Sequence, residues 1–389
     1  MALAHQSTTG IPEAKELHAK SIVVDTHDDT TQRLLDPNFE FGARHSDGNV
    51  DIPRMREGGL DAIFFSIWIP GMVTGQPAVD RALVQIQAVR RTVAAHPNDL
   101  VLCTTADEIR RAKAAGKIAA LMGVEGGHMI NNDLATLDKF YGLGVRYMTL
   151  THTVNTDWAD SSGDKPAHDG LTPFGKQVVA EMNKLGMMVD ISHVSDKTFY
   201  DVLATSKAPV IASHSSCRAI CSAPRNMTDE MIKDLAAHGG VIQINYHIGF
   251  LSQEYADAYN NHPEYGKEID AETKKRCGAN EACELIEADK IVREYVAAGK
   301  LPRVEWTKIV EHIDHAVKLV GADHVGLGSD FDGADMPYGM DDVSKLPEIT
   351  NALLAKGYSP ADVQKILGGN TLRLMQQVQD VSKKLGGKS

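Results

Sequence analysis

The chain alternates between short apolar runs and amphipathic stretches eight times. The apolar runs are rich in β-branched and aliphatic residues, as buried strands are, and cover residues 21–26, 61–68, 118–124, 145–151, 187–192, 210–213, 241–246 and 324–329. Helical periodicity fills gaps between them, over residues 78–96, 134–143, 175–185, 195–205, 228–238 and 307–320. Strand alternating with helix in this way predicts an α/β fold, a parallel (β/α)8 TIM barrel.

Length and composition agree with one barrel of this kind. The 389 residues are 43% hydrophobic and 24% charged, which is enough to build a large core in an ordinary globular protein. The sequence has no repeat beyond the strand and helix alternation, and no low-complexity linker. We therefore predict a single domain over residues 1–389, with the barrel core at about 20–345 and C-terminal helices over 346–385.

Two long segments interrupt the alternation, and long loops in compact domains are usually functional or disordered. Residues 154–173 follow the fourth predicted strand and are expected to border the substrate pocket. Residues 249–304 follow the seventh strand and are expected to form a lid or a subunit contact. Cys277 and Cys283 lie in this second insertion, where they form either a local disulfide, if the protein is exported, or two free thiols.

Charge and hydropathy exclude several classes of partner. The net charge of -12 argues against a nucleic-acid binder, because neutralising phosphates requires a concentrated basic surface. No run approaches the roughly 20 apolar residues that cross a bilayer. The first ten residues, MALAHQSTTG, lack the charged and apolar regions of a signal peptide, so the chain is expected in the cytoplasm or, after removal of a leader, in the periplasm. A small-molecule partner is the remaining expectation.

Six of the predicted strands end at side chains that bind metals or exchange protons. These side chains are His27 with Asp29, Glu125, His152, His193, His214 and Asp330. The carboxyl ends of all strands in a parallel barrel meet at one mouth, which is where the active sites of such barrels lie. The sequence therefore predicts that side chains separated by three hundred positions form one site.

His27, Asp29 and Glu125 are the first candidates for metal ligands. His27 and Asp29 are two positions apart, so both point to the same side of a strand and can reach one ion, although such a pair alone is more often part of a hydrogen-bonded loop. We interpret their neighbours Asp25 and Asp28 as structural. Glu125 follows a buried strand, where a carboxylate is costly unless it is paired or binds a cation; capping the next helix is the alternative.

Five ligands are too many for one ion. Neutral imidazoles combined with carboxylates suit Zn²⁺ or a similar divalent ion. We therefore predict two metals that share Glu125, with His27 and Asp29 on one, and His193 and His214 on the other.

Three further residues are candidates for catalysis and substrate binding. Asp330 directly follows the last strand and is predicted to exchange protons beside a metal-bound water, with Asp332 as a competing choice. His152 is either a sixth ligand or a donor that polarises a substrate carbonyl. Arg225 offers a planar fork for a carboxylate, against the alternative of an ordinary surface arginine.

In these segments the chain resembles the membrane (renal) dipeptidases, peptidase family M19, within the amidohydrolase-type metal barrels. The resemblance rests on motifs that occur in the family's order, at residues 24–29, 123–127, 150–152, 155–160, 170–175, 190–195, 213–216, 225–226 and 328–333. Two features depart from the family pattern: Asp28 stands where an Asn or similar residue is usual, and the 249–304 insertion is long and highly charged. Both departures bear on substrate preference more than on chemistry.

The resemblance implies a function and a set of roles. It implies a zinc-dependent dipeptidase in which Glu125 bridges two zinc ions, a bridging hydroxide attacks the peptide bond, and a D-residue is tolerated at the C-terminal position. It further implies that His152 contacts the substrate, that Arg225 holds the C-terminal carboxylate, and that Asp330 shuttles the proton. Members of the family are commonly homodimers, so a homodimer is expected here.

Two other functions compete with this expectation. One is a different binuclear metal hydrolase acting on a small amide or lactone, or tailoring a peptide natural product. Many such barrels bridge their metals with a modified lysine after the fourth strand, where this chain has His152 and no adjacent lysine. The other is a catalytically silent barrel that binds peptides, which would be expected to have lost a ligand or the acid/base residue.

Overall fold

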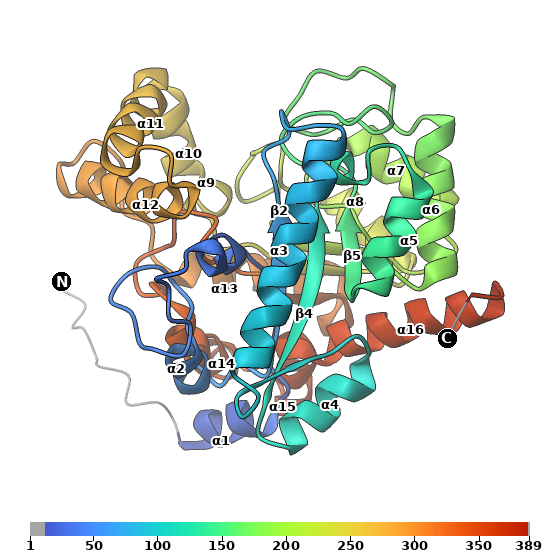
Figure 1. The fold of residues 1–389 in the computed structure, drawn as a ribbon. Helices are drawn as coiled ribbons and strands as arrows, with labels where there is room; N and C mark the ends of the chain where they lie inside the picture. Colours follow the sequence, from blue (N-terminus) through green and yellow to red (C-terminus); the bar gives the residue numbers. More distant parts are fainter. Residues whose placement is uncertain (1–11, 388–389) are drawn as a thin grey trace.

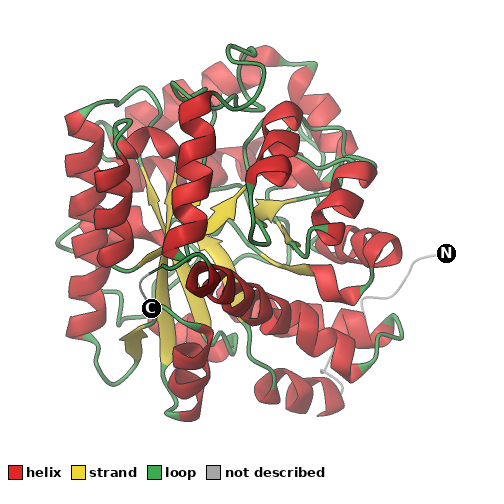
Figure 2. Ribbon diagram, turned by 90° about the vertical axis from the view of Figure 1, so that its right-hand side faces the viewer, coloured by secondary structure: helices red, strands yellow, loops and turns green. Residues whose placement is uncertain are grey.

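The structure, a computed structural model, describes residues 12–387. The predicted absence of a signal peptide concerns the first ten residues, which lie outside the described residues. In the described part, nine parallel strands form one sheet that curls into a nearly closed barrel surrounded by helices (Figures 1 and 2). The strands are β1 (Val24–Asp28), β2 (Ala62–Trp68), β3 (Leu100–Leu102), β4 (Ile118–Glu125), β5 (Val145–Thr149), β6 (Met188–Asp190), β7 (Ile211–Ser215), β8 (Val241–Ile244) and β9 (Val325–Leu327).

The (β/α)8 prediction is confirmed, and all eight predicted strands are present. Their order around the barrel is β1-β2-β4-β5-β6-β7-β8-β9, with every neighbouring pair parallel. The additional strand β3 pairs only with β4 and lies outside this order. Sequence reasoning missed β3 because three residues are too few to show a periodicity.

Contacts between the first and last strands close the barrel. Asp28 and Phe331 form a parallel bridge, and the backbone N–H of Asp29 donates to the Phe331 carbonyl at 2.8 Å. The buried carboxylate of Asp25 accepts from the backbone N–H of Ser329 at 2.8 Å and from the Ser329 hydroxyl. This seam sets β1 and β9 side by side, which brings residues 27–29 next to Asp330.

Helices cover the barrel wall and close its lower end. The wall helices that follow strands in the β/α alternation are α3 (Gln76–Ala95), α4 (Ala106–Ala114), α5 (Leu134–Gly142), α6 (Pro173–Leu185), α7 (Asp196–Thr205), α8 (Asp229–Ala237) and α13 (Thr307–Val320). The short helix α2 (Ile52–Glu57) lies between β1 and β2, and the helices before or after the alternation are α1 (Pro12–Lys20), α14 (Leu346–Ala355), α15 (Pro360–Gln364) and α16 (Asn370–Lys384). Apolar residues of α16, such as Leu372 and Met375, share a core cluster with Val24 and Phe64 of the barrel. The C-terminal helices therefore belong to the barrel's own core.

The segment after β8 folds into helices beside the barrel mouth. They are α9 (Ile248–Leu251), α10 (Gln253–Asn260), α11 (Pro263–Cys277) and α12 (Glu281–Ala297), which stand at the upper left of Figure 1. Of the two states predicted for Cys277 and Cys283, a disulfide or two free thiols, the structure shows the disulfide, which spans the turn between α11 and α12. Among the described residues, no helix has both the length and the apolar character needed to cross a membrane.

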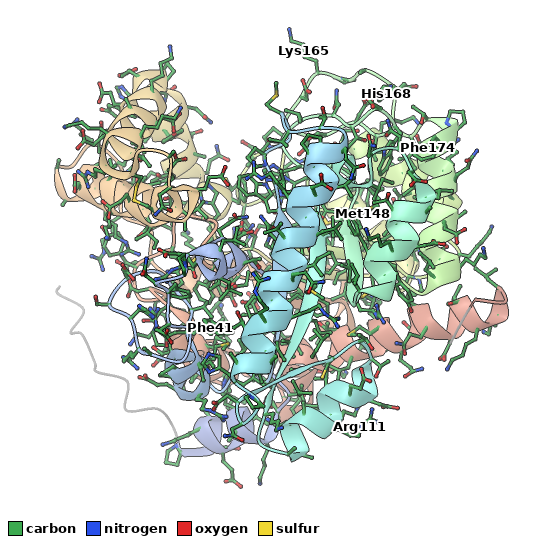
Figure 3. All side chains as sticks on the ribbon, viewed as in Figure 1. Phe41, Arg111, Met148, Lys165, His168 and Phe174 are labelled. Carbon is green, nitrogen blue, oxygen red and sulfur yellow. A yellow bond between two sulfur atoms is a disulfide. The ribbon has the colours of Figure 1, made fainter. Side chains whose placement is uncertain are left out.

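The loop 154–173 extends outward at the upper edge of the molecule, where Lys165 and His168 are labelled in Figure 3. The Asp160 carboxylate organises it by accepting backbone N–H groups of Ala167 at 2.9 Å, His168 at 3.0 Å and Gly170 at 2.9 Å. The charged tip of this loop therefore faces solvent, while its base is fixed by a buried carboxylate.

The seam gives the first testable prediction. Asp25→Ala leaves the Ser329 N–H and hydroxyl without their buried acceptor, so we expect the free energy of unfolding to fall by about 2 kcal/mol. Denaturant titration followed by circular dichroism measures this loss. Asp25→Asn retains one acceptor oxygen and should lose clearly less. An Asp25→Ala variant as stable as the wild type would show that these hydrogen bonds do not stabilise the seam.

Candidate metal centre

The structure brings the strand-end residues together at the barrel mouth. Three groups of side chains have ligand atoms within 4.8 Å of one another: His27, Glu125 and His214; Glu125, His152 and His193; and His27, Asp29 and Asp330. All seven strand-end residues selected from the sequence belong to at least one group. The metal-binding and catalytic roles assigned to them stay predictions, but the juxtaposition on which those roles depend is present.

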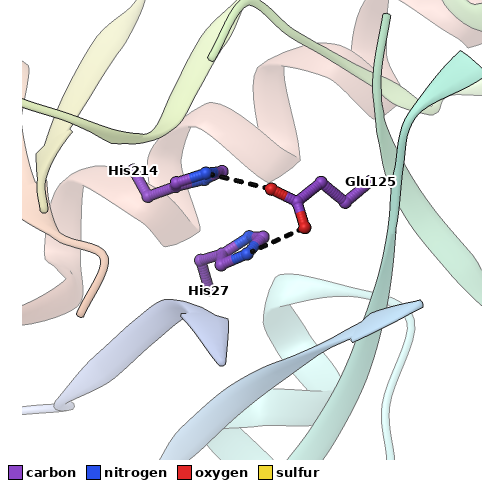
Figure 4. Close-up of side chains that lie close together, drawn as sticks. All are labelled: His27, Glu125 and His214. Carbon is purple, nitrogen blue, oxygen red and sulfur yellow. Dashed lines mark ion pairs between the residues drawn. The ribbon is translucent and has the colours of Figure 1, made fainter. Parts of the chain in front are cut away.

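Glu125 lies between the two predicted ligand sets. It is the last residue of β4, and its Oε2 faces His27 Nε2 at 3.5 Å. Its Oε1 faces His193 Nε2 at 2.9 Å and His214 Nε2 at 3.2 Å. Figure 4 shows the two oxygens pointing to His27 and His214. One carboxylate thus offers a separate oxygen to each side of the site.

The two histidines on the Oε1 side are suited to metal binding. Their Nε2 atoms are 2.9 Å apart, and burial holds the pKa of both His193 and His214 well below the usual value, so both imidazoles are neutral at pH 7. Metal ions bind the neutral imidazole. Two neutral nitrogens and a carboxylate oxygen that converge on one point form a donor set that fits a divalent cation.

Unpartnered atoms on the other side of Glu125 also indicate a site for a cation. His27 is completely buried, Asp29 is 5% exposed, and neither His27 Nε2 nor Asp29 Oδ1 has a hydrogen-bond partner among the described residues. The remaining Asp29 oxygen, Oδ2, is 3.5 Å from His27 Nε2. Buried polar atoms are rarely left without partners. A cation placed between these side chains would satisfy both.

Polar groups behind the ligands hold them in position. The Tyr147 hydroxyl contacts His27 Nδ1 at 2.9 Å, and the Ser213 hydroxyl contacts His214 Nδ1 at 2.8 Å. Ser213 in turn donates to the Asp190 carboxylate at 2.6 Å. Gly123 makes room for Tyr147, because a Cβ at this position would lie 1.9 Å from the Tyr147 ring. Such contacts orient both imidazoles so that Nε2 points into the site.

Two of the candidate residues have unusual backbone conformations. His193 has φ of 66° and Asp330 has φ of 67°, a region that residues other than glycine rarely adopt. Strained residues of this kind cluster at functional sites, where the surrounding structure holds them. In both cases the turn directs a strand-end side chain inward over the barrel mouth.

The structure distinguishes Asp330 from Asp332. Asp330 Oδ2 accepts a hydrogen bond from Asn245 Nδ2 at 2.8 Å, and Oδ1 is 3.9 Å from His27 Nε2. Burial raises the pKa of Asp330 to about 6. Asp332 instead accepts from the Thr30 hydroxyl at 2.5 Å and the Asn49 N–H at 2.6 Å, so it fixes loops outside the site.

His152 and Arg225 lie at the edge of the centre. His152 Nε2 is 3.8 Å from Glu125 Oε1, and its Nδ1 accepts from the indole N–H of Trp68 at 3.3 Å. Arg225 donates to the His214 carbonyl at 2.9 Å, while its Nε is buried and has no partner in the described chain. Arg225 is therefore anchored beside the ligands and is not an ordinary surface arginine.

A cavity of about 410 Å³ opens above the centre. Its lining from the barrel side includes Asp29, Trp68, Glu125, His152, His193 and Asp330, and Phe250 of α9 adds to the wall. Its lining from α11 and α12 includes Asp270, Thr273, Lys274, Glu284, Leu285 and Ala288. The 249–304 insertion thus covers the site as a lid. The expectation for the loop 154–173 was wrong for this cavity, since none of those residues lines it.

Three residues of the site were not predicted as functional. Asn245 follows β8 and holds Asp330, Trp68 ends β2 and contacts His152, and Tyr147 lies within β5. Trp68 is the last residue of the predicted strand 61–68, so attention to every strand end would have found it. Asn245 lay inside the predicted strand 241–246, and only the observed end of β8 at Ile244 marks it as a strand-end residue. Tyr147 carried no such signal, because its side chain reaches the site from below.

Comparison with known proteins identifies the family. The sequence profile of the membrane dipeptidases (peptidase family M19) matches residues 11–389, nearly the whole chain. The chain belongs to this family. The resemblance seen in the motifs is therefore confirmed over the full barrel and the C-terminal helices.

Individual relatives agree with this assignment. Dipeptidase 3 of Mus musculus is 34% identical over 363 residues, which are 92% of this chain and 63% of that protein. Among solved structures, the probable dipeptidase PvdM from Pseudomonas aeruginosa has a TM-score of 0.79 and 30% identity, covering 95% of this chain and 98% of its own. This chain therefore spans somewhat less than two thirds of the mouse relative but nearly all of the bacterial one.

A third comparison includes a ligand. The metallo peptidase from Rhodobacter sphaeroides was solved with a phosphinate mimic of the dipeptide L-Ala-D-Ala, and has a TM-score of 0.76 and 27% identity to this chain. The match covers 92% of this chain and 100% of that chain. The two proteins share the whole barrel.

Proposed function

We propose that this protein is a zinc-dependent dipeptidase that hydrolyses the single peptide bond of dipeptides. The observation that carries the proposal is the position of Glu125, whose two carboxylate oxygens face two separate donor sets beneath Asp330. Family membership supports the same reaction class. A hydrolase that tailors a peptide natural product shares this chemistry and differs only in substrate size.

Two zinc ions would be held by the two donor sets. His27 and Asp29 would bind one, His193 and His214 the other, and Glu125 would bridge them. When bound, such ions polarise the scissile carbonyl and lower the pKa of a shared water from 15.7 toward about 7, which provides the nucleophile at neutral pH. The unpartnered atoms of His27 and Asp29 support this ligand set.

Asp330 is placed to move a proton. Its Oδ2 is held by Asn245, which leaves Oδ1 directed toward His27 and the space above Glu125. A carboxylate in that position can accept a proton from the attacking water and deliver it to the departing amine. Asn245 therefore acts as a positioning residue for the proton carrier.

His152 fits substrate contact better than metal binding. The Trp68 indole N–H can only donate, so the His152 nitrogen that accepts from it, Nδ1, carries no proton. Burial lowers the pKa of His152, so the ring is neutral and its proton is on Nε2. An Nε2–H donor cannot ligate a metal but can stabilise the oxygen of the scissile carbonyl.

Arg225 is proposed to bind the C-terminal carboxylate of the dipeptide. Its guanidinium is held by the His214 carbonyl, and the unpartnered Nε–H remains available for a planar carboxylate. Recognition of a free carboxylate next to the scissile bond would limit the enzyme to dipeptides. The L-Ala-D-Ala mimic bound to the Rhodobacter sphaeroides relative supports tolerance of a D-residue at this position.

A dipeptide library that varies the chirality of the C-terminal residue tests the proposed function. Zinc-loaded protein should release free amino acids from dipeptides, including several with a C-terminal D-residue, and leave tripeptides and dipeptide amides intact. Absence of turnover in protein that contains its full complement of metal would favour the silent peptide-binding barrel. Hydrolysis of lactones in place of dipeptides would favour the rival hydrolase.

Metal content tests the ligand assignment separately from activity. The protein should bind about two zinc ions per chain, and the double variant His193→Ala with His214→Ala should bind about one, measured by elemental analysis after dialysis. His128→Gln serves as the matched control, because His128 follows Glu125 closely but belongs to none of the three ligand groups. Equal loss in the control would refute the assignment.

Replacing the proton carrier should abolish turnover without removing metal. We expect Asp330→Asn to lower kcat by about 100-fold or more while metal content stays near the wild-type value, because the amide cannot exchange protons. Asp332→Asn removes a nearby carboxylate that has no place in the site, and its kcat should change by less than about threefold. Near-normal turnover by the Asp330 variant would exclude this role.

A further inference from the structure

A second cavity, of about 380 Å³, adjoins the cavity above the metal centre. It lies between α10 and the segment 222–224 that precedes Arg225. His247, Phe250 and Asp335 line both cavities, so the two spaces share a wall. No part of the reaction proposed above uses this second cavity.

The second cavity has carboxylates in its wall and no lysine or arginine among its described lining residues. Asp257 is occupied, since it accepts from the side-chain amide of Gln253 at 2.7 Å. Asp335 forms no ion pair within 4.0 Å in the part of the chain that the structure describes. Arg293, the nearby cation, is committed to Asp289 at 2.7 Å and to Asp341 at 3.0 Å.

The Asp335 carboxylate is therefore in an environment that favours a cation. Burial and the negative charge of Asp289 raise the pKa of Asp335 to about 7. Asp335 is half-buried, and withdrawing an unpaired carboxylate from water costs free energy that a cation beside it offsets. Within residues 12–387, no lysine or arginine forms an ion pair with Asp335.

One residue of the same wall carries a buried hydroxyl without a partner. Tyr255 is 3% exposed, lines the second cavity, and its Oη has no hydrogen-bond partner among the described residues. The Tyr255 ring stacks on Tyr259 with centroids 6.2 Å apart, and Phe250 adds a third aromatic ring to the wall. Aromatic faces combined with a carboxylate recognise ammonium and guanidinium groups.

The position of Arg225 indicates which part of a substrate would reach this cavity. The Arg225 guanidinium lies 5.4 Å from the centroid of the Phe250 ring, and Pro224 lines the second cavity. If Arg225 holds the C-terminal carboxylate, the residue that carries this carboxylate is the one next to Phe250. Because Phe250 lines both cavities, the side chain of that residue would lie beside the wall of the second cavity.

We propose that the second cavity is a subsite for the basic side chain of the C-terminal residue of the dipeptide, a lysine or an arginine. Asp335 pairs with the cationic group, the hydroxyl of Tyr255 accepts a hydrogen bond from it, and the aromatic rings pack against its apolar stem. This inference rests on the proposed dipeptidase function, which supplies the carboxylate that Arg225 holds.

Kinetics of the zinc-loaded enzyme test the subsite. The wild type should have a kcat/KM for Ala-Arg about tenfold higher than for Ala-Ala, as a charge-assisted hydrogen bond would give. Asp335→Asn, an isosteric change, should bring this ratio close to one, and Tyr255→Phe should lower it by about threefold. The matched control Glu254→Gln removes an exposed carboxylate from the same helix as Tyr255 and should leave the ratio unchanged.

Binding of a hydrolysis product provides a readout that needs no turnover. Isothermal calorimetry of the zinc-loaded wild type should show arginine binding about tenfold more tightly than alanine, and Asp335→Asn should remove the difference. Thermal unfolding checks that each variant is folded.

The outcomes separate the two proposals. A wild type without preference for Ala-Arg, or a preference that Asp335→Asn leaves intact, overturns the subsite while the dipeptidase function stands. A protein that hydrolyses no dipeptide refutes the proposed function, and the calorimetric comparison of arginine with alanine then still decides whether Asp335 receives a cation.

Discussion

A buried carboxylate at the centre of the barrel mouth governs this site. Glu125 lies at the end of β4 with one oxygen toward His27 and the other toward His193 and His214. Removing such a group from water is costly unless a positive charge compensates it. The imidazoles of His193 and His214 are neutral and provide no positive charge on their side of the carboxylate, so a cation would compensate Glu125 there. The contacts of Tyr147 and Ser213 orient the imidazole nitrogens toward the position that a cation would occupy.

The seam between β1 and β9 has a second function besides closing the barrel. It places the His27 and Asp29 pair next to Asp330, although more than three hundred residues separate them in the sequence. The same geometry lets Asn245, at the end of the neighbouring β8, hold Asp330 from the far side. The predicted proton carrier and the predicted metal ligands His27 and Asp29 thereby come from different strands, so each can be substituted without changing the other.

Much of this arrangement could be predicted from the sequence. The apolar runs identified the eight barrel strands, and parallel topology then required residues such as His27, Glu125 and His214 to meet. Residues that act through contacts between distant segments could not be found in this way. Tyr147 is an ordinary buried aromatic in the sequence, and Asp335 stands out only once α10 and Arg293 are placed around it. Periodicity reports how a segment is buried, but it does not report which neighbours a side chain will lack.

The helical insertion has a consequence for how this enzyme class diversifies. Six residues of α11 and α12 line the cavity above the candidate metal centre, yet the predicted ligands come from strand ends and their adjoining loops. The disulfide between Cys277 and Cys283 joins these two helices near their shared turn. A hairpin cross-linked in this way can accumulate substitutions, or be exchanged for another, without moving a single ligand. Substrate preference can therefore change through substitutions in this hairpin while the predicted metal ligands and the predicted proton carrier stay the same.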